Sequence, residues 1–397
     1  MADKIVLAYS GGLDTSVAIT WLKENYGYDV VALAVGLGGG EDMDEAIDRA
    51  LRNGALEAFS VDASDEFATD FIAPAVKANA LYEDKYPLAT ALGRPLIVKK
   101  LIEQAKKSGA TAVAHGCTGK GNDQVRFDVG LKTLAPELKI IAPIREWKMS
   151  RDEEIDYAAE HDIEIKVDKD KVYSIDANIW GCAIEGGRLE DPWNEPGDDV
   201  YLMTKSPAEC PDGPSYAEIE FAKGVPAALD GKTMELKEII TTLNIMAGEN
   251  GVGRLDMIEN RLVGIKSREV YEAPAAISII TANKALESLT LERELLHYKR
   301  GAEQKYAELV YFGQWFSPLR LALDAFFEEI QRHVSGTVKL RFYKGNLSIA
   351  GVRSPASLYS YEMATYDQAD LFNHDAAAGF IELWGLPLTE WAKKNKK

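Results

Sequence analysis

A glycine-rich turn between an apolar run and a helical pattern constrains this chain more than any other feature. Gly11 and Gly12 in this turn allow positive φ and let backbone N–H groups approach a ligand closely. Ser10, Thr15 and Ser16 add hydroxyl groups where the helical pattern begins. Because free N–H groups and the helix dipole both favour negative charge at a helix start, the turn predicts an anion site.

Strand-like and helix-like patterns alternate from the N-terminus to about residue 166. Apolar runs predict buried strands at residues 5–8, 30–35, 58–61, 111–115 and 139–142. Ser64 is expected to cap one helix, and Ser150 with Glu153 forms a capping box that opens another. The alternation implies an α/β fold, in which a doubly wound parallel sheet binds ligands at the carboxyl ends of its strands.

The pattern changes after about residue 167, and the remainder is expected to be α+β. Residues 173–214 show little periodicity and predict a long irregular region. Ser317 followed by Pro318 predicts a helix start. Two hairpins are predicted, one across Asp230-Gly231 with strands at 218–223 and 233–236, the other with strands at 338–343 and 347–352.

Charge and composition exclude several classes of partner. The 397 residues include 45 Lys and Arg against 63 Asp and Glu, a net charge of −18, whereas a nucleic-acid surface needs clustered basic side chains. No apolar run approaches the ~20 residues of a membrane helix, and the N-terminus lacks a signal-peptide pattern, so a cytoplasmic location without membrane contact is expected. Three scattered cysteines and five histidines predict neither a disulfide framework nor a protein-built metal site.

A second glycine-rich motif spans His115 to Phe127 and follows a predicted strand, so it should lie at the same sheet edge as the first turn. Asn122 and Asp123 are expected to cap a helix that carries Arg126 in its first turn. Taken alone, the motif is also compatible with a capped helix after a flexible loop.

Residues 10–16, Ser-Gly-Gly-Leu-Asp-Thr-Ser, resemble the pyrophosphate loop of the N-type ATP pyrophosphatases, and no Walker A pattern is present. With the second motif included, the chain resembles the argininosuccinate synthase family over essentially its whole length. Further segments that carry this resemblance are residues 21–24, 81–84, 174–176, 251–254, 258–261, 266–268 and 271–272.

The resemblance implies a ligase that condenses citrulline with aspartate, using ATP and Mg²⁺, and releases AMP and pyrophosphate. It also implies an adenine nucleotide alpha hydrolase-like ATP-pyrophosphatase domain at residues 1–166 and a synthetase domain at 167–365. Residues 366–397 would form an oligomerisation tail in a homotetramer. The partners would be the small molecules citrulline, aspartate and ATP.

Site residues also follow from the resemblance. Catalytic roles would belong to Ser10, Asp14 and Asp123. ATP would contact Ala8, Tyr9, Ser10, Gly11, Gly12, Leu13, Asp14, Thr15, Ser16, Val35 and Gly116. Aspartate would contact Thr118, Asn122 and Asp123. Citrulline would contact Tyr86, Asn122, Arg126, Ser174, Glu259 and Tyr271.

Simpler interpretations stand beside these roles. Tyr86 and Tyr271 could equally be half-buried tyrosines that pack in the core. Glu259 could be a solvated charge, and Ser174 could be an ordinary loop serine. Lys120 could be either a phosphate clamp or a solvated lysine. The chain departs from the resemblance at Ala91 and Ala183, where many members have serine, at Cys117 and Cys182, and at residues 36–39, where glycines replace an acidic residue and a glutamine.

Two rival functions remain open at this point. The first is another ATP pyrophosphatase, such as a tRNA thiolase or an amidotransferase-linked synthetase. A tRNA thiolase would need paired catalytic cysteines and a basic RNA-binding face, and an amidotransferase would need a glutaminase nucleophile. Neither pattern is visible in the sequence. The other is a nucleotide-binding sensor without turnover, which would bind ATP and release no pyrophosphate.

Overall fold

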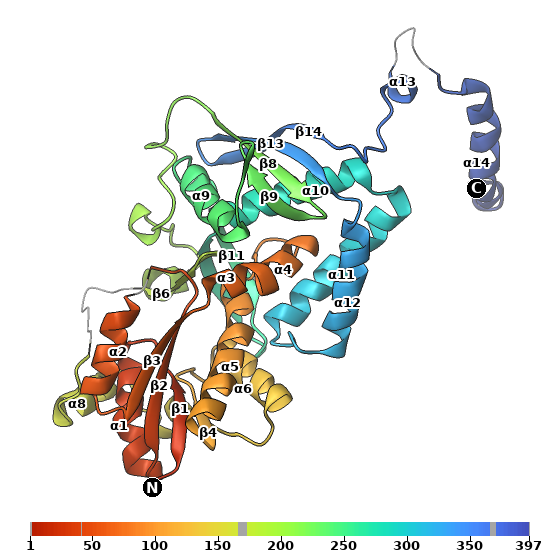
Figure 1. The fold of residues 1–397 in the computed structure, drawn as a ribbon. Helices are drawn as coiled ribbons and strands as arrows, with labels where there is room; N and C mark the ends of the chain where they lie inside the picture. The colour runs from red at the N-terminus through yellow and green to blue at the C-terminus, as the bar shows by residue number, and fades with distance from the viewer. Residues whose placement is uncertain (1, 41, 166–172, 366–370, 397) are drawn as a thin grey trace. The chain divides into compact units, whose positions relative to one another are not determined.

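Five parallel strands form the sheet of the N-terminal half, in the order β3-β2-β1-β4-β5. Figure 1 labels the first four of them, β3, β2, β1 and β4. Their bounds are β1 Lys4–Ala8, β2 Asp29–Gly36, β3 Glu57–Asp62, β4 Ala112–Ala114 and β5 Lys139–Ile141. The computed structural model describes residues 2–40, 42–165, 173–365 and 371–396. All five predicted strands are confirmed, and β1 lies centrally with β2 and β4 as its neighbours.

Helices cover both faces of this sheet. The helices of the N-terminal half are α1 Leu13–Tyr26, α2 Met43–Arg52, α3 Ser64–Glu66, α4 Ala73–Lys77, α5 Ala89–Ser108, α6 Asp123–Leu134, α7 Pro143–Trp147 and α8 Arg151–Glu160, with a π-helical turn at Phe67–Ile72. Ile5 and Leu7 pack with α1, whereas the alternate residue Val6 packs with α5 and α6. Because successive strand residues point to opposite faces, the doubly wound arrangement is confirmed.

Two predicted helix starts differ from expectation. Ser64 is the first residue of α3 rather than its cap, and its hydroxyl donates to Asp62. Asn122 occupies the cap position of α6, but its side chain makes no capping bond because it is engaged with distant residues. The capping box of Ser150 with Glu153 is confirmed at α8.

The second half contains two antiparallel sheets, with strand orders β11-β12-β7-β6 and β10-β9-β8-β13-β14. The first sheet comprises β6 Ser174–Asn178, β7 Gly181–Glu185, β11 Arg254–Asn260 and β12 Lys266–Glu272. The second comprises β8 Ser215–Ala222, β9 Val225–Leu229, β10 Lys232–Thr233, β13 Gly336–Tyr343 and β14 Asn346–Arg353. The helices are α9 Leu236–Gly248, α10 Pro274–Thr290, α11 Arg293–Tyr311 and α12 Pro318–Gln331, with 3₁₀ turns at Gly187–Glu190 and Asp198–Val200.

The strand predictions for this half were partly wrong. Residues 173–214 are not irregular throughout, because β6 and β7 form a hairpin there. Asp230-Gly231 does turn a hairpin, but it joins β9 to β10, and Leu236 already begins α9. The β13–β14 hairpin and the Ser317 cap of α12 are confirmed.

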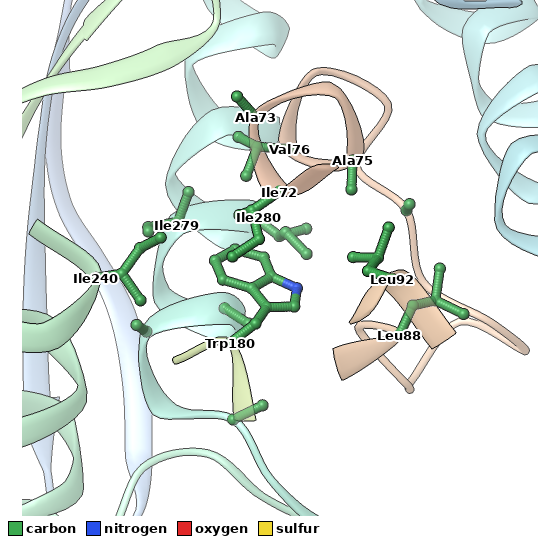
Figure 2. Packing of buried hydrophobic residues seen from close by; sticks show 14 of the residues in the cluster. Ile72, Ala73, Ala75, Val76, Leu88, Leu92, Trp180, Ile240, Ile279 and Ile280 are labelled. Atoms are coloured by element: carbon green, nitrogen blue, oxygen red, sulfur yellow. The ribbon is translucent and has the colours of Figure 1, made fainter. Parts of the chain in front are cut away.

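The turn between β6 and β7 inserts Trp180 into the largest hydrophobic cluster, where its side chain is fully buried. Its indole Nε1 donates to the Pro87 carbonyl at 2.8 Å, just before α5. Figure 2 shows the indole among side chains from α4, α5, α9 and α10, including Val76, Leu92, Ile240, Ile279 and Ile280. One core therefore spans both halves.

The glycines that follow β2 allow the second half to approach the first. A Cβ on Gly39 would lie 2.3 Å from the Ala177 carbonyl oxygen of β6. The Ile179 N–H donates to the Leu37 carbonyl at 3.0 Å. The departure of residues 36–39 from the family pattern thus has a structural reason, since a side chain at Gly39 would collide with the neighbouring backbone.

The chain divides into two compact units, Met1–Ala356 and Ser357–Lys397. The second unit contains α13 Tyr361–Ala364 and α14 His374–Asn395. The proposed boundaries after residues 166 and 365 involve residues outside the described ranges, so the three-part division stays a prediction. None of the helices in the described ranges combines the length and apolar character that a bilayer crossing needs. The cytoplasmic location stays a prediction.

Candidate active site

A cavity of about 870 Å³ opens at the carboxyl edge of the parallel sheet and extends to the β11-β12-β7-β6 sheet. Most predicted site residues line it together: Ala8, Tyr9, Ser10, Gly11, Gly12, Thr15, Val35, Tyr86, Gly116, Thr118, Asn122, Asp123, Arg126, Ser174, Glu259 and Tyr271. Leu13, Asp14, Ser16 and Lys120 are not part of this lining. The cavity volume lies within the usual range for small-molecule sites.

The first glycine turn presents bare backbone at one end of the cavity. Gly11 has φ +73°, and Gly12 precedes α1 without any side-chain cap on the first N–H groups of the helix. Ser10 Oγ and Thr15 Oγ1 lie 3.2 Å apart beside these groups. Uncapped N–H groups, hydroxyls and the positive end of the helix dipole together suit an anion with several oxygens.

The two glycine motifs lie side by side, as expected for loops that follow neighbouring strands. A Cβ on Gly116 would lie 3.0 Å from Thr15 Cγ2. His115 is fully buried below Gly116, and its Nε2 lies 2.8 Å from Asp128 Oδ1. The imidazole therefore anchors the start of the loop to α6, and Gly116 and Gly121 of this motif line the cavity.

Ser16 and Leu13 support the turn from within the protein. Ser16 is fully buried, and its hydroxyl lies 3.1 Å from the Tyr9 hydroxyl. Burial raises the pKa of Tyr9, so its phenol stays protonated. Leu13 packs against Val17 and Ala158. Both residues hold the turn in shape without reaching the cavity.

Asp14 faces Glu154 of α8, whose side chain is buried with one carboxyl oxygen unpartnered. Burial raises the pKa of Glu154 to about 8, and the hydrogen bond and charge of Asp14 add to the shift. Glu154 therefore carries a proton at neutral pH and can donate it to the Asp14 carboxylate. This contact fixes Asp14 in the first turn of α1, directly after the glycine turn.

Two arginines hold Asp123 at the middle of the cavity. Arg94 Nε donates to Asp123 Oδ2 at 2.9 Å, and Arg126 Nη1 donates to Oδ1 at 2.7 Å. Arg94 also pairs with Asp176 of β6. Burial raises the pKa of Asp123, but the two guanidinium groups outweigh this effect and set the pKa at about 2. Asp123 is therefore a carboxylate at any physiological pH.

Asn122 connects three distant parts of the chain. Its Nδ2 donates to the Tyr311 hydroxyl at 2.8 Å, and its Oδ1 accepts from the Leu262 N–H at 2.9 Å. The Tyr311 hydroxyl in turn donates to Glu259. This chain of hydrogen bonds aligns the start of α6 with the end of β11.

Glu259 lies in β11 among tyrosines and is only 2% exposed. It accepts from Tyr271 at 2.7 Å and from Tyr311. Tyr86 stacks on Tyr271 with ring centroids 3.9 Å apart, and the Tyr86 hydroxyl accepts from the Thr90 N–H. Burial raises the pKa of Glu259, while both phenols and Arg126 favour its charged form. These contacts form an aromatic pocket with one acidic group.

Several lining residues were missed by sequence reasoning: Arg49, Arg94, Asp176, Glu185, Arg261, Glu269 and Tyr311. Arg261 belongs to the Ile258-Glu259-Asn260-Arg261 segment that carries the family resemblance, so it could have been found there. Arg94 lies inside α5 and Tyr311 is the last residue of α11. Neither has a local sequence signal, and only tertiary contacts reveal them.

Two family models together match most of the chain. A family model described as the arginosuccinate synthase N-terminal HUP domain covers residues 4–164, and one described as the C-terminal domain covers 173–391. The argininosuccinate synthase of Rubrobacter xylanophilus is 57% identical over 99% of this chain and 96% of its own. Those of Oceanobacillus iheyensis and Brevibacillus brevis are 56% and 55% identical, covering 97% and 99% of this chain and 92% and 94% of theirs.

A solved structure of a U34-tRNA thiolase from Methanococcus maripaludis is a distant match. It is 19% identical with a TM-score of 0.28, over 41% of this chain and 58% of its own. Such a likeness is too low to support an argument about fold or function.

The raised pKa of Glu154 predicts that the free energy of unfolding depends on pH. An unfolded glutamate has a pKa near 4.3, so between about pH 4 and 8 the folded state holds a proton that the unfolded state has lost. Stability from Glu154 therefore falls as pH rises through this window. Glu154→Gln does not titrate, so we expect it to gain roughly 1–3 kcal/mol relative to the parent protein between pH 6 and 9 in urea unfolding.

Glu153→Gln on the same helix is the matched control. Glu153 is stabilised as a carboxylate by the Ser150 N–H, which lowers its pKa, so this variant should show a constant offset from pH 6 to 9. Parallel stability profiles for the parent protein and Glu154→Gln would contradict the assignment of the proton.

Proposed function

The chain belongs to the argininosuccinate synthase family, and from this premise we propose how its cavity carries out the family's reaction. The activity is the ATP-dependent ligation of citrulline and aspartate in arginine biosynthesis. The observation that supports our assignments is that one cavity contains both the glycine turn and the Asp123–Arg126–Glu259 group. An anion-binding turn and an amino-acid pocket in one cavity suit the activation of a substrate by a nucleotide.

The turn of residues 10–15 would hold the β- and γ-phosphates of ATP on uncapped N–H groups and hydroxyls. Val35 and Gly116 line the cavity beside it and would contact the rest of the nucleotide. Leu13 and Ser16 would act by shaping the turn, since they lie behind it. Lys120 is exposed outside the cavity lining, which favours its role as a solvated lysine.

Mg²⁺ would enter with the nucleotide. Among the described residues no group of three or more His, Cys, Asp or Glu is arranged to hold a metal ion. This fits a cation bound largely by the phosphates, because Mg²⁺ usually takes only one or two protein carboxylates besides phosphate and water. Asp14 faces Glu154 and would act on the cation indirectly, through the position of the α1 start.

The aromatic pocket suits citrulline. Glu259 would pair with its α-ammonium, Arg126 would pair with its carboxylate, and the stacked pair of Tyr86 and Tyr271 would form one wall against its alkyl chain. Ser174 lines the cavity from the start of β6 and would add a hydroxyl contact. Asn122 lies between this pocket and the aspartate site and would contact both substrates.

Aspartate would bind at Thr118, Asn122 and Asp123. Asp123 remains a carboxylate and would receive the substrate ammonium, while Arg94 and Arg126 hold that carboxylate in place. Asp176 also pairs with Arg94, so two guanidinium groups and two carboxylates balance at this point of the cavity.

The reaction needs activation of a poor electrophile. The ureido oxygen of citrulline attacks the α-phosphorus, the bond to the bridging oxygen breaks, and pyrophosphate leaves with the electron pair. The aspartate amine then attacks the ureido carbon, AMP leaves, and the amine loses a proton. Because no protein nucleophile is required, orientation and charge stabilisation by the cavity would provide most of the rate.

Pyrophosphate release tests the function. We expect the protein to release pyrophosphate from ATP only with citrulline and Mg²⁺ present, and to form argininosuccinate when aspartate is added. EDTA should abolish both. ATP binding without citrulline-dependent pyrophosphate release would instead indicate a nucleotide-binding sensor, and equal release without citrulline would refute the substrate assignment.

Ala183 offers a gain-of-function test. It lines the cavity in β7, paired with Tyr271 of β12, where many family members have serine. We expect Ala183→Ser to lower the KM for citrulline by about 2- to 10-fold, because a hydroxyl can add one hydrogen bond. Ala91→Ser is the matched control: Ala91 is buried outside the cavity lining and should leave this KM unchanged or impair folding. An unchanged KM in Ala183→Ser would remove Ala183 from the citrulline site.

Helix α14 supports a homotetramer as the assembled state. It exposes many large apolar side chains: Phe380, Ile381, Leu383, Trp384, Leu386, Leu388 and Trp391. Exposed apolar surface of this extent is typical of an interaction site. We expect light scattering to give the mass of four chains, and the chain truncated after Ala356 to lose that state. A monomeric full-length chain would contradict this proposal.

A further inference from the structure

Arg49 of α2 reaches the glycine turn from the side. Its Nη1 donates to the Gly11 carbonyl at 2.6 Å, and the side chain is only 3% exposed. A Cβ on Gly11 would lie 3.4 Å from both Arg49 Nη1 and Ala46 Cβ. Helix α2 therefore packs directly on the turn, and the guanidinium of Arg49 fixes the carbonyl of Gly11.

Arg49 also lines the cavity, and its ion-pair partner there is a partly exposed carboxylate. Arg49 Nη2 pairs with Glu45 one helical turn earlier, and both side chains line the cavity. Glu45 is 43% exposed, so this ion pair gains less than a buried one. Two hydrogen bonds use two of the five N–H donors of the guanidinium, and within the described chain no protein acceptor engages the other three.

The other arginines of the cavity have different tasks. Within the described chain, the lining includes Arg94, Arg126 and Arg261 besides Arg49. Arg94 and Arg126 hold Asp123, and Arg261 pairs with Glu185 and Glu269. Of these four, Arg49 is the one hydrogen-bonded to the glycine turn.

We propose that Arg49 is a pyrophosphate-positioning residue, which fixes the turn through Gly11 and exchanges Glu45 for an oxygen of the departing pyrophosphate. This inference rests on the proposed binding of the triphosphate at the turn. When the bond from the α-phosphorus to its bridging oxygen breaks, negative charge accumulates on the pyrophosphate. A guanidinium that is already held by Gly11 stabilises this charge with little reorganisation. Glu45 is its counterion until the phosphates arrive.

The two members of the ion pair should have opposite effects on pyrophosphate. Removing the guanidinium in Arg49→Gln removes a charge-assisted bond, so we expect the Ki of inorganic pyrophosphate and the KM of MgATP to rise about 10- to 100-fold. Removing the competing carboxylate in Glu45→Gln should leave both constants unchanged or lower them. A purely structural pair would predict weaker binding in both variants.

The experiment measures the two constants in the full-length protein for Arg49→Gln, Arg49→Lys and Glu45→Gln. Arg49→Lys keeps the charge and should fall between Arg49→Gln and the parent protein. Arg52→Gln is the matched control, because Arg52 lies on the same helix, pairs with Glu164 and does not line the cavity. It should leave both constants unchanged.

Three results would overturn the proposal: equal weakening in Arg49→Gln and Glu45→Gln, a change of less than twofold in Arg49→Gln, or weakening in Glu45→Gln alone. If Arg49→Gln does not fold, Arg49→Lys is compared with Glu45→Gln instead. Weaker binding in Arg49→Lys alone supports the proposal, and equal weakening in both variants overturns it. The variant Ser10→Ala distinguishes a wrong role for Arg49 from a wrong assignment of the ATP site. If Ser10→Ala weakens MgATP while the Arg49 variants do not, the turn binds ATP and Arg49 has no part in it.

Discussion

The paired charges of Asp123, Arg94 and Arg126 are the constraint on which the rest of the cavity depends. A charged group that is removed from water is costly unless an opposite charge and hydrogen bonds compensate it. Arg94 comes from α5, Asp123 and Arg126 from α6, and Asp176 from β6, so these contacts join both halves of the chain. The site is therefore assembled only when α5, α6 and the β6–β7 hairpin are all in place.

The sequence predicted those features of the fold and of the cavity that depend on residues close together in the chain. Apolar runs identified the five parallel strands, and the glycine turn identified one end of the cavity because its conformation depends on residues only a few positions apart. The family resemblance then identified residues of the aromatic pocket that line the cavity, including Glu259 and Tyr271, which are unremarkable in isolation.

What the sequence could not predict depends on contacts between distant segments. Asn122 looks like a helix cap, but Tyr311, 189 residues away, engages its side chain. Glu154 looks like an ordinary surface glutamate of an acidic helix, and only the packing of α8 on α1 buries it beside Asp14. The β6–β7 hairpin was missed because the alternation in β6 covers only five residues and β7 has none; the pairing of β7 with β12 and the burial of Trp180 are contacts with distant segments.

The position of Trp180 also determines which motions are open to the protein during turnover. Its indole is enclosed by α4 and α5 on one side and by α9 and α10 on the other (Figure 2). Swinging the two halves apart like a clamshell would expose the indole to water and break its bond to Pro87. Any movement that separates the two halves at Trp180 therefore has to offset the loss of this burial and of the indole hydrogen bond.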